Sequence, residues 1–370
     1  MRYYLIAGEP SGDLHGSYLI RAIRAEDPDA EFRAWGGDLM EAAGAVLVKH
    51  YRELAFMGVV EVIKNLPTIL RNQKACQEDI AAYAPDRLVL IDYSGFNLRV
   101  AKWAKPAGFD VSYYISPQVW ASRSGRVKQI KAYVDRMLVI LPFEEAWYAE
   151  RGVKATFVGH PLLDVVGDQS NSQTVKQSSK NLPTIALLPG SRKQEITVGL
   201  PLMLAAAAEL PGHHYVIAGA PAQNPAFYTS IIASCDRAPE SIEVRMNQTY
   251  PLLRQAHAAI VTSGTATLET ALFAVPQVVV YKGNWLAYHI AKWMIGSRIK
   301  YISLVNLVMD APVVTELIQG AFNPKNLAEH LKSILAGPAR NQQLDQLAQL
   351  REQLGAGGAA GRAARAIVIG

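Results

Sequence analysis

The sequence predicts an α/β protein made of two doubly wound, Rossmann-like domains that face a cleft. Three observations predict this class. Short apolar runs alternate with longer amphipathic runs, which indicates βαβ units around a parallel sheet. The alternation lapses at the polar stretch 168–180 and then starts again. The length of 370 residues also suits two hydrophobic cores better than one.

The strands of the first half are predicted from continuous apolar runs, because strands covered by helices on both faces carry few polar residues. These runs are 3–7, 87–91, 111–115 and 137–140. Amphipathic stretches between them predict helices at 14–25, 60–83, 98–105 and 124–133. We therefore expect the first domain at 1–166 and a polar linker at 167–182.

The second half repeats the same rhythm and is expected to form a domain at 183–340. Its apolar runs predict strands at 184–188, 215–218, 242–245, 259–261 and 278–280. Its amphipathic runs predict helices at 197–209, 265–273 and 326–335. The tail at 341–370 has two interpretations: a frayed end, or a segment that crosses back to the first domain.

Composition excludes several classes of protein. The two cysteines, Cys76 and Cys235, lie in different halves, so neither a disulfide framework nor a thiolate metal site is expected. No apolar run approaches membrane-spanning length, and the first residues lack the apolar stretch of a signal peptide, so we expect a cytoplasmic protein. The formal net charge of +5 suits phosphorylated substrates or an anionic membrane surface, or only aids solubility. Without metal-binding or nucleic-acid motifs, we expect no metal, no cofactor and no nucleic acid.

Polar turns that follow predicted strands are the candidate sites, because doubly wound sheets bind ligands at the carboxyl ends of their strands. The first such turn, GEPSGD at 8–13, contains Glu9, Ser11 and Asp13. Its small residues let the backbone approach a ligand, and its amides can bind an anion at the start of a helix. The alternative is a tight turn in which Asp13 caps the helix.

Two turns of the second half predict phosphate binding. In LLPGSRKQE, a Gly-Ser turn precedes Arg192, whose planar guanidinium suits a phosphate; the alternative is a solvated arginine. In TSGTATLE, hydroxyls and amides that suit a diphosphate come from Ser263, Gly264 and Thr265. Glu269 follows one helical turn later, where a carboxylate can accept from ribose hydroxyls. Together these turns indicate a nucleoside diphosphate held without a Walker motif.

Asp92 is the candidate general base. It follows a predicted strand at the start of the turn DYSGFN, and burial there would raise its pKa toward neutrality. The alternative is that Asp92 only caps the next helix. His160, in VGHP, is either a loop ligand for substrate or a structural histidine.

One helix is a candidate for membrane contact. Its apolar side chains share a face, flanked by cations, and are Val62, Ile63, Leu66, Ile69 and Leu70. Such a stripe can rest on an anionic membrane surface or admit acyl chains. The alternative is an ordinary helix that faces the core.

Taken in order, the motifs of this chain resemble those of lipid-A-disaccharide synthase over nearly its whole length. They are GEPSGDLHG at 8–16, WGGDLMEAAG at 35–44, AFMGVVEVIKNL at 55–66, YISPQVWASRSGRVKQI at 114–130, LPFE at 141–144, FVGHPLLD at 157–164, LLPGSRKQEI at 187–196, VTSGTATLETAL at 261–272 and ISLVNLV at 302–308. No single motif decides the resemblance, but their joint order is specific.

The resemblance implies a glycosyltransferase-B architecture that needs no metal. It implies inverting transfer of 2,3-diacylglucosamine from its UDP conjugate to the 6-hydroxyl of 2,3-diacylglucosamine 1-phosphate. The product would be a β-1,6-linked lipid A disaccharide 1-phosphate, with release of UDP. The resemblance also implies peripheral attachment to the inner face of the cytoplasmic membrane, and it favours acyl-chain contact by the stripe defined above. A homodimer is left open.

The resemblance also implies roles for individual residues. Arg192 would neutralise the leaving diphosphate, Ser11 would contact it from the first domain, and Asn306 matches an asparagine of the nucleotide-sugar site. Many members read IDxPDFN, in which the second Asp is the usual candidate base, whereas this chain has Gly95 there. Asp92 is therefore the first choice of base, and Glu9 or Asp13 the second. The rival interpretation is a UDP-N-acetylglucosamine epimerase or cell-wall glucosaminyltransferase of the same architecture.

Overall fold

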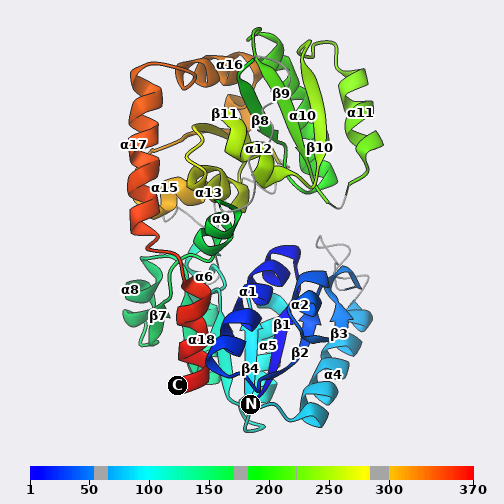
Figure 1. Ribbon diagram of the computed structural model, residues 1–370, viewed down its shortest axis with the longest axis vertical. Helices are drawn as coiled ribbons and strands as arrows, with labels where there is room; N and C mark the ends of the chain where they lie inside the picture. Colours follow the sequence, from blue (N-terminus) through cyan, green and yellow to red (C-terminus); the bar gives the residue numbers. More distant parts are fainter. Residues whose placement is uncertain (54–65, 123, 171–181, 222, 284–299) are drawn as a thin grey trace. The chain divides into compact units, whose positions relative to one another are not determined.

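The computed structural model describes residues 1–53, 66–122, 124–170, 182–221, 223–283 and 300–370 (Figure 1). The chain forms two compact units. Unit 1 consists of Met1–Asp164 together with Leu354–Gly370, and unit 2 consists of Val165–Gln353. Each unit contains one parallel sheet covered by helices, so the predicted α/β class with two doubly wound halves is confirmed.

The sheet of unit 1 has seven parallel strands in the order β3-β2-β1-β4-β5-β6-β7. The strands are β1 (Arg2–Ala7), β2 (Glu31–Gly36), β3 (Val46–His50), β4 (Arg87–Ile91), β5 (Val111–Tyr114), β6 (Arg136–Val139) and β7 (Ala155–Phe157). The strand order reverses between β1 and β4, and this reversal is the position at which doubly wound sheets bind ligands.

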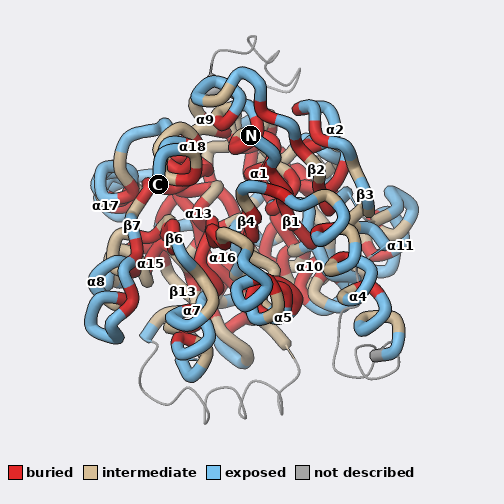
Figure 2. Tube along the Cα trace, turned by 90° about the horizontal axis from the view of Figure 1, so that it is seen from below, coloured by how far each residue is buried: buried red, intermediate tan, exposed pale blue. Residues whose placement is uncertain are grey.

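Alternate side chains of the unit 1 strands enter two different cores. Tyr4 and Ile6 of β1 face one core, whereas Tyr3 and Leu5 face the other, and all four are fully buried. Figure 2 shows the central strands in the colour of buried residues. The first core is closed by α4 (Leu66–Tyr83), α5 (Ser94–Ala104), α7 (Val127–Tyr133) and α8 (Glu144–Ala149). The second is closed by α1 (Pro10–Glu26), α2 (Asp38–Ala42) and α18 (Ala359–Ile369).

The sheet of unit 2 has six parallel strands in the order β10-β9-β8-β11-β12-β13, and it reverses between β8 and β11. The strands are β8 (Thr184–Leu188), β9 (His214–Gly219), β10 (Ile242–Met246), β11 (Ala256–Thr262), β12 (Gln277–Tyr281) and β13 (Thr315–Ile318). The helices are α10 (Lys193–Ala208), α11 (Pro225–Ser234), α12 (Thr249–Gln255), α13 (Thr265–Leu272), α15 (Leu304–Met309), α16 (Pro324–Ser333) and α17 (Pro338–Gln353). Helix α9 (Leu162–Ser170) begins in unit 1 and ends in unit 2.

The C-terminal residues form a packed helix of unit 1 rather than a frayed end. Helix α18 packs against α1 (Figure 1). Its N-terminus is held by Asp164, whose carboxylate accepts hydrogen bonds from the backbone amides of Gly358, Ala359 (3.2 Å) and Ala360 (2.9 Å). Capping by a carboxylate satisfies amides that the helix cannot satisfy itself. The C-terminal helix is thereby attached to Asp164, the last residue of the first segment of unit 1.

Candidate active site

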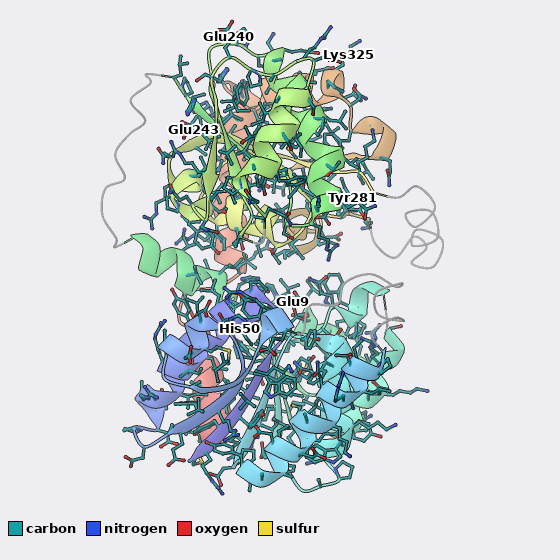
Figure 3. The ribbon with its side chains drawn as sticks, turned by 90° about the vertical axis from the view of Figure 1, so that its right-hand side faces the viewer. Glu9, His50, Glu240, Glu243, Tyr281 and Lys325 are labelled. Atoms are coloured by element: carbon teal, nitrogen blue, oxygen red, sulfur yellow. The ribbon has the colours of Figure 1, made fainter. Side chains whose placement is uncertain are left out.

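The turns that follow β1 and β4 lie side by side at the switch point of the unit 1 sheet. Ala7 and Ile91 are in register, so the residues that follow them, Gly8 and Asp92, leave the sheet together. The ring of Tyr93 covers Gly8 so closely that a Cβ atom built on the glycine would lie 2.4 Å from it. Glycine is required at this contact because any side chain would displace the tyrosine. Figure 3 shows Glu9 and His50 at the same end of this sheet.

The backbone at Asp92 is strained. Asp92 and Tyr93 both have φ of 44°, in the left-handed region that non-glycine residues rarely adopt. Such residues cost about 1–3 kcal/mol each and gather at functional sites. The Nδ2 atom of the buried Asn97 donates to the main-chain oxygen of Asp92 (2.9 Å), to that of Ile91 (3.2 Å) and to that of Ile6 (3.3 Å). These contacts fix the direction in which the turn leaves the sheet.

The pKa of the Asp92 carboxyl group lies in a range that suits a general base. Burial and, to a smaller extent, the negative charge of Glu9 raise its pKa to about 6, and a hydrogen bond from the backbone amide of Tyr93 opposes the shift. The capping alternative is not supported, because the N-cap residue of α5 is Tyr93 and no side chain caps this helix. Asp92 is thus a half-buried carboxylate that titrates close to neutral pH.

The other two carboxylates of this region differ in their contacts. Asp13 is only 3% exposed, and its oxygens accept from the amides of Gly37 (2.8 Å), Met40 (3.0 Å) and Leu39 (3.1 Å). Asp13 therefore holds the start of α2 rather than capping its own helix, and these contacts favour a structural role. Glu9 is exposed at the start of α1, which leaves it as the second candidate base. Ser11 is exposed in the first turn of the same helix.

In unit 2, the turn between β8 and α10 presents Arg192. Its guanidinium is 65% exposed and contacts the Oε1 atom of Glu195 at 3.1 Å. Gly190 has φ of 103°, and a Cβ atom there would lie 2.7 Å from the Oε2 atom of Glu195, so the turn needs glycine. Glu195 therefore orients an arginine that remains accessible to an anion.

The turn between β11 and α13 combines exposed backbone with a partly buried carboxylate. Gly264 and Thr265 are exposed, and Ser263 donates its hydroxyl to the main-chain oxygen of Ile302 (2.9 Å). Burial raises the pKa of Glu269 to about 7, against a hydrogen bond from Tyr250 that lowers it. The turn thus offers amides for an anion, with an acceptor group one helical turn later.

Asn306 has its amide group committed within unit 2. Its Nδ2 atom donates to the main-chain oxygen of Val314 and to the Oε1 atom of Glu316, both at 2.9 Å, and its Oδ1 atom accepts from the amide of Val314 at 2.9 Å. It is 1% exposed. Glu316 also accepts from the amide of Ile302 (2.9 Å). This geometry favours a positioning role for Asn306, behind the segment that Ser263 contacts, over direct contact with a nucleotide.

The predicted membrane stripe is only partly visible. Val62 and Ile63 lie outside the described residues, and Leu66 is the first residue of α4. Ile69 is half-buried and Leu70 is 53% exposed, so membrane contact stays a prediction. Within the described part of the chain, no helix is long and apolar enough to cross a membrane.

Sequence reasoning left His160 undecided and missed a buried carboxylate. His160 is buried, its Nδ1 atom accepts from the amide of Leu162 (3.3 Å), and burial with help from His15 lowers its pKa to about 3. Its burial and this contact favour the structural interpretation. Glu144, at the start of α8, is 1% exposed. The sequence signal that could have identified it is an acidic residue at the end of an apolar run. Among the described residues, no cluster of His, Cys, Asp or Glu could hold a metal ion.

Comparisons with known proteins agree with the sequence motifs. The family model described as lipid-A-disaccharide synthetase matches residues 3–366. The lipid-A-disaccharide synthase of Syntrophus aciditrophicus is 42% identical over 368 residues, covering 97% of this chain and 95% of the relative. That of Myxococcus xanthus is 40% identical over 375 residues, covering 99% of this chain and 97% of the relative. The predicted resemblance is therefore confirmed.

Solved structures share the fold at low sequence identity. The UDP-GlcNAc 2-epimerase of Neisseria meningitidis, bound to UDP-GlcNAc, matches with a TM-score of 0.66 and 11% identity, covering 97% of both chains. The glycotransferase of kitacinnamycin matches with a TM-score of 0.64 and 15% identity, covering 100% of this chain and 97% of the other. These matches establish the glycosyltransferase-B type of fold. They do not favour the epimerase interpretation, because fold alone does not specify chemistry.

Proposed function

The chain belongs to the lipid-A-disaccharide synthase family and is a glycosyltransferase of lipid A biosynthesis, and from this premise we propose its substrates and the course of its reaction. The donor is UDP-2,3-diacylglucosamine, and the acceptor is 2,3-diacylglucosamine 1-phosphate. The products are the β-1,6-linked disaccharide 1-phosphate and UDP. The configuration at the anomeric carbon of the transferred sugar is inverted in a single displacement.

The observation that carries this proposal is the raised pKa of Asp92 in its strained turn. In the proposed step, its carboxylate takes the proton of the acceptor 6-hydroxyl while that oxygen forms a bond to the donor anomeric carbon. The bond from this carbon to the UDP oxygen breaks, and UDP leaves with the electron pair. A base whose pKa is about 6 is deprotonated at neutral pH and still basic enough to assist the attack. The hydrogen bond from Asn97 holds the backbone of Asp92, which lowers the entropic cost of reaching the transition state.

The donor nucleotide is assigned to unit 2. Amides of Gly264 and Thr265 bind the diphosphate at the start of α13, and the exposed guanidinium of Arg192 neutralises its developing charge. Glu269 accepts from the ribose hydroxyls. Ser11 of unit 1 is assigned a contact to the same diphosphate. A nucleotide held by charge-assisted hydrogen bonds requires no metal for its departure.

Helix α4 leaves an apolar side chain exposed beside cations. Leu70 is exposed near the start of this helix, and Arg71 and Lys74 beside it are also exposed. We propose that this region contacts acyl chains of the substrates at the inner face of the cytoplasmic membrane. Apolar groups flanked by cations suit the boundary between anionic head groups and acyl chains.

Incubation of the purified protein with defined acylated donor and acceptor tests this function. Mass spectrometry should detect the disaccharide 1-phosphate together with one equivalent of UDP, and nuclear magnetic resonance should show a β-1,6 linkage. Formation of an α-linked product would contradict inversion. Turnover of UDP-N-acetylglucosamine without turnover of the acylated donor would contradict the substrate assignment.

A further inference from the structure

The turn that follows β5 is strained and lies beside Asp92. Ile91 and Tyr114 are in register, and the amide of Asp92 donates to the main-chain oxygen of Tyr114 at 3.1 Å. The next residue, Ile115, has φ of 64°. A β-branched residue is a rare outlier in this left-handed region, because its side chain crowds the backbone. The neighbouring strands β4 and β5 thus both lead into strained turns at the carboxyl end of the sheet.

A buried carboxylate ties this second turn to the rest of unit 1. The Oε2 atom of Glu144 accepts from the amides of Leu141 (2.9 Å) and Ile140 (3.2 Å), which follow β6. Its Oε1 atom accepts from the indole Nε1 atom of Trp120 at 3.1 Å. The Trp120 ring also packs edge-on against Phe143, with centroids 5.0 Å apart. Glu144 therefore joins the turn after β5 to the turn after β6.

A second buried hydrogen bond holds the start of the same turn. The hydroxyls of Ser116 and Tyr148 lie 2.7 Å apart, and Ser116 is 4% and Tyr148 0% exposed. Burying polar groups is unfavourable unless their partners are well placed. Because both buried groups have a partner, these contacts hold the turn in its strained conformation, and strained backbone of this kind gathers at functional sites.

The side chain that the turn presents is Gln118. From Val111 through Val119, it is the one exposed residue, between the buried Pro117 and Val119. A carboxamide both donates and accepts hydrogen bonds, so it suits sugar hydroxyls and the N-acyl amide of a glucosamine. We propose that Gln118 binds the acceptor sugar beside Asp92, and that Trp120 and Glu144 are positioning residues that hold it there. This inference rests on the proposed function and names the residue that selects its acceptor.

The test measures KM separately for acceptor and donor in the full-length protein. The Gln118→Ala variant should raise the acceptor KM by about 3- to 10-fold, the value of one neutral hydrogen bond, and leave the donor KM unchanged. Gln118→Asn should recover part of the loss. The matched control is Gln129→Ala, which removes another exposed glutamine of unit 1 and should change neither constant. An unchanged acceptor KM in Gln118→Ala overturns the proposal.

The positioning role is tested with Trp120→Phe, which removes the indole donor but keeps an aromatic ring against Phe143. This variant should also raise the acceptor KM. In the Gln118→Ala background it should add nothing further, because residues that act as a unit are not additive. Independent, additive effects would overturn the positioning role, and thermal unfolding identifies any loss of stability. Failure of the proposed function is distinguishable from failure of this inference, because in that case the unmodified protein forms no disaccharide.

Discussion

The side-chain amide of Asn97 donates a hydrogen bond of 2.9 Å to the main-chain oxygen of Asp92. The bond spans the first turn of α5 and binds the helix to the strained residue that precedes its N-cap. Because the same amide reaches Ile6 and Ile91, a single buried side chain joins β1, β4 and the candidate base. The position of Asp92 therefore depends on a buried side chain of the core as well as on its own turn.

Asn97→Ala should lower both stability and turnover. The substitution leaves three main-chain oxygens without this donor in a buried site, which we expect to cost about 2–3 kcal/mol. Turnover should fall by roughly tenfold or more because the Asp92 turn can relax. Urea unfolding and steady-state kinetics measure the two effects. A variant that is destabilised but turns over normally would show that the bond does not position the base.

Activity should fall at acidic pH, and the midpoint should depend on Glu9. The base must be deprotonated, so kcat/KM should decline as pH falls through about 6, the pKa of Asp92. The negative charge of Glu9 raises that pKa, so Glu9→Gln should shift the acidic limb of the pH profile to lower pH. A shift to higher pH would contradict the proposed coupling between the two carboxylates.

Binding of UDP should weaken as pH falls through about 7. Burial raises the pKa of Glu269 to that value, and the protonated carboxyl is a poorer acceptor for ribose hydroxyls than the carboxylate. Titration calorimetry at pH 6 and pH 8 should show tighter binding at the higher pH. In Glu269→Gln this dependence should be reduced to that of the phosphates alone. An equal pH dependence in both proteins would remove Glu269 from the nucleotide site.

Arg192→Ala should weaken UDP binding by roughly 10-fold or more, because a charge-assisted contact to phosphate is lost. Lysine at this position should restore only part of the affinity, since it lacks the planar fork of the guanidinium. Arg237→Ala is the matched control. Arg237 is exposed in the segment that precedes the edge strand β10, whereas Arg192 follows the carboxyl end of the central strand β8, so removal of Arg237 should leave UDP affinity unchanged. Equal losses in both variants would indicate a nonspecific effect of net charge.

The central strands could be predicted from the sequence because helices cover both of their faces. In β1 and β4, only the first residue is not buried, so each is a continuous apolar run. The edge strand β3 was missed because Lys49 and His50 end its short apolar run. The strand β2 was missed because Glu31 and Arg33 interrupt its apolar run. Strands at the margin of a sheet carry the polar residues that obscure them.

The candidate site could be predicted only as far as its turns. Gly, Ser and Thr after an apolar run locate the carboxyl end of a strand, which was enough to propose Ser263 and Asp92 as candidates. The partners of a buried side chain depend on tertiary packing instead. Asn306 bonds to Val314 and Glu316, and Asp13 bonds to three amides more than twenty residues away. No local pattern distinguishes such residues from those that contact a ligand.

The most direct test of the account is the turnover of Asp92→Asn with acylated donor and acceptor. Asparagine keeps the shape of the side chain and removes its basicity, so kcat should fall by about 100-fold or more. The melting temperature and the affinity for UDP should stay unchanged. Turnover close to that of the unmodified protein, in a variant that folds and binds UDP normally, would contradict the account and assign the base to another residue.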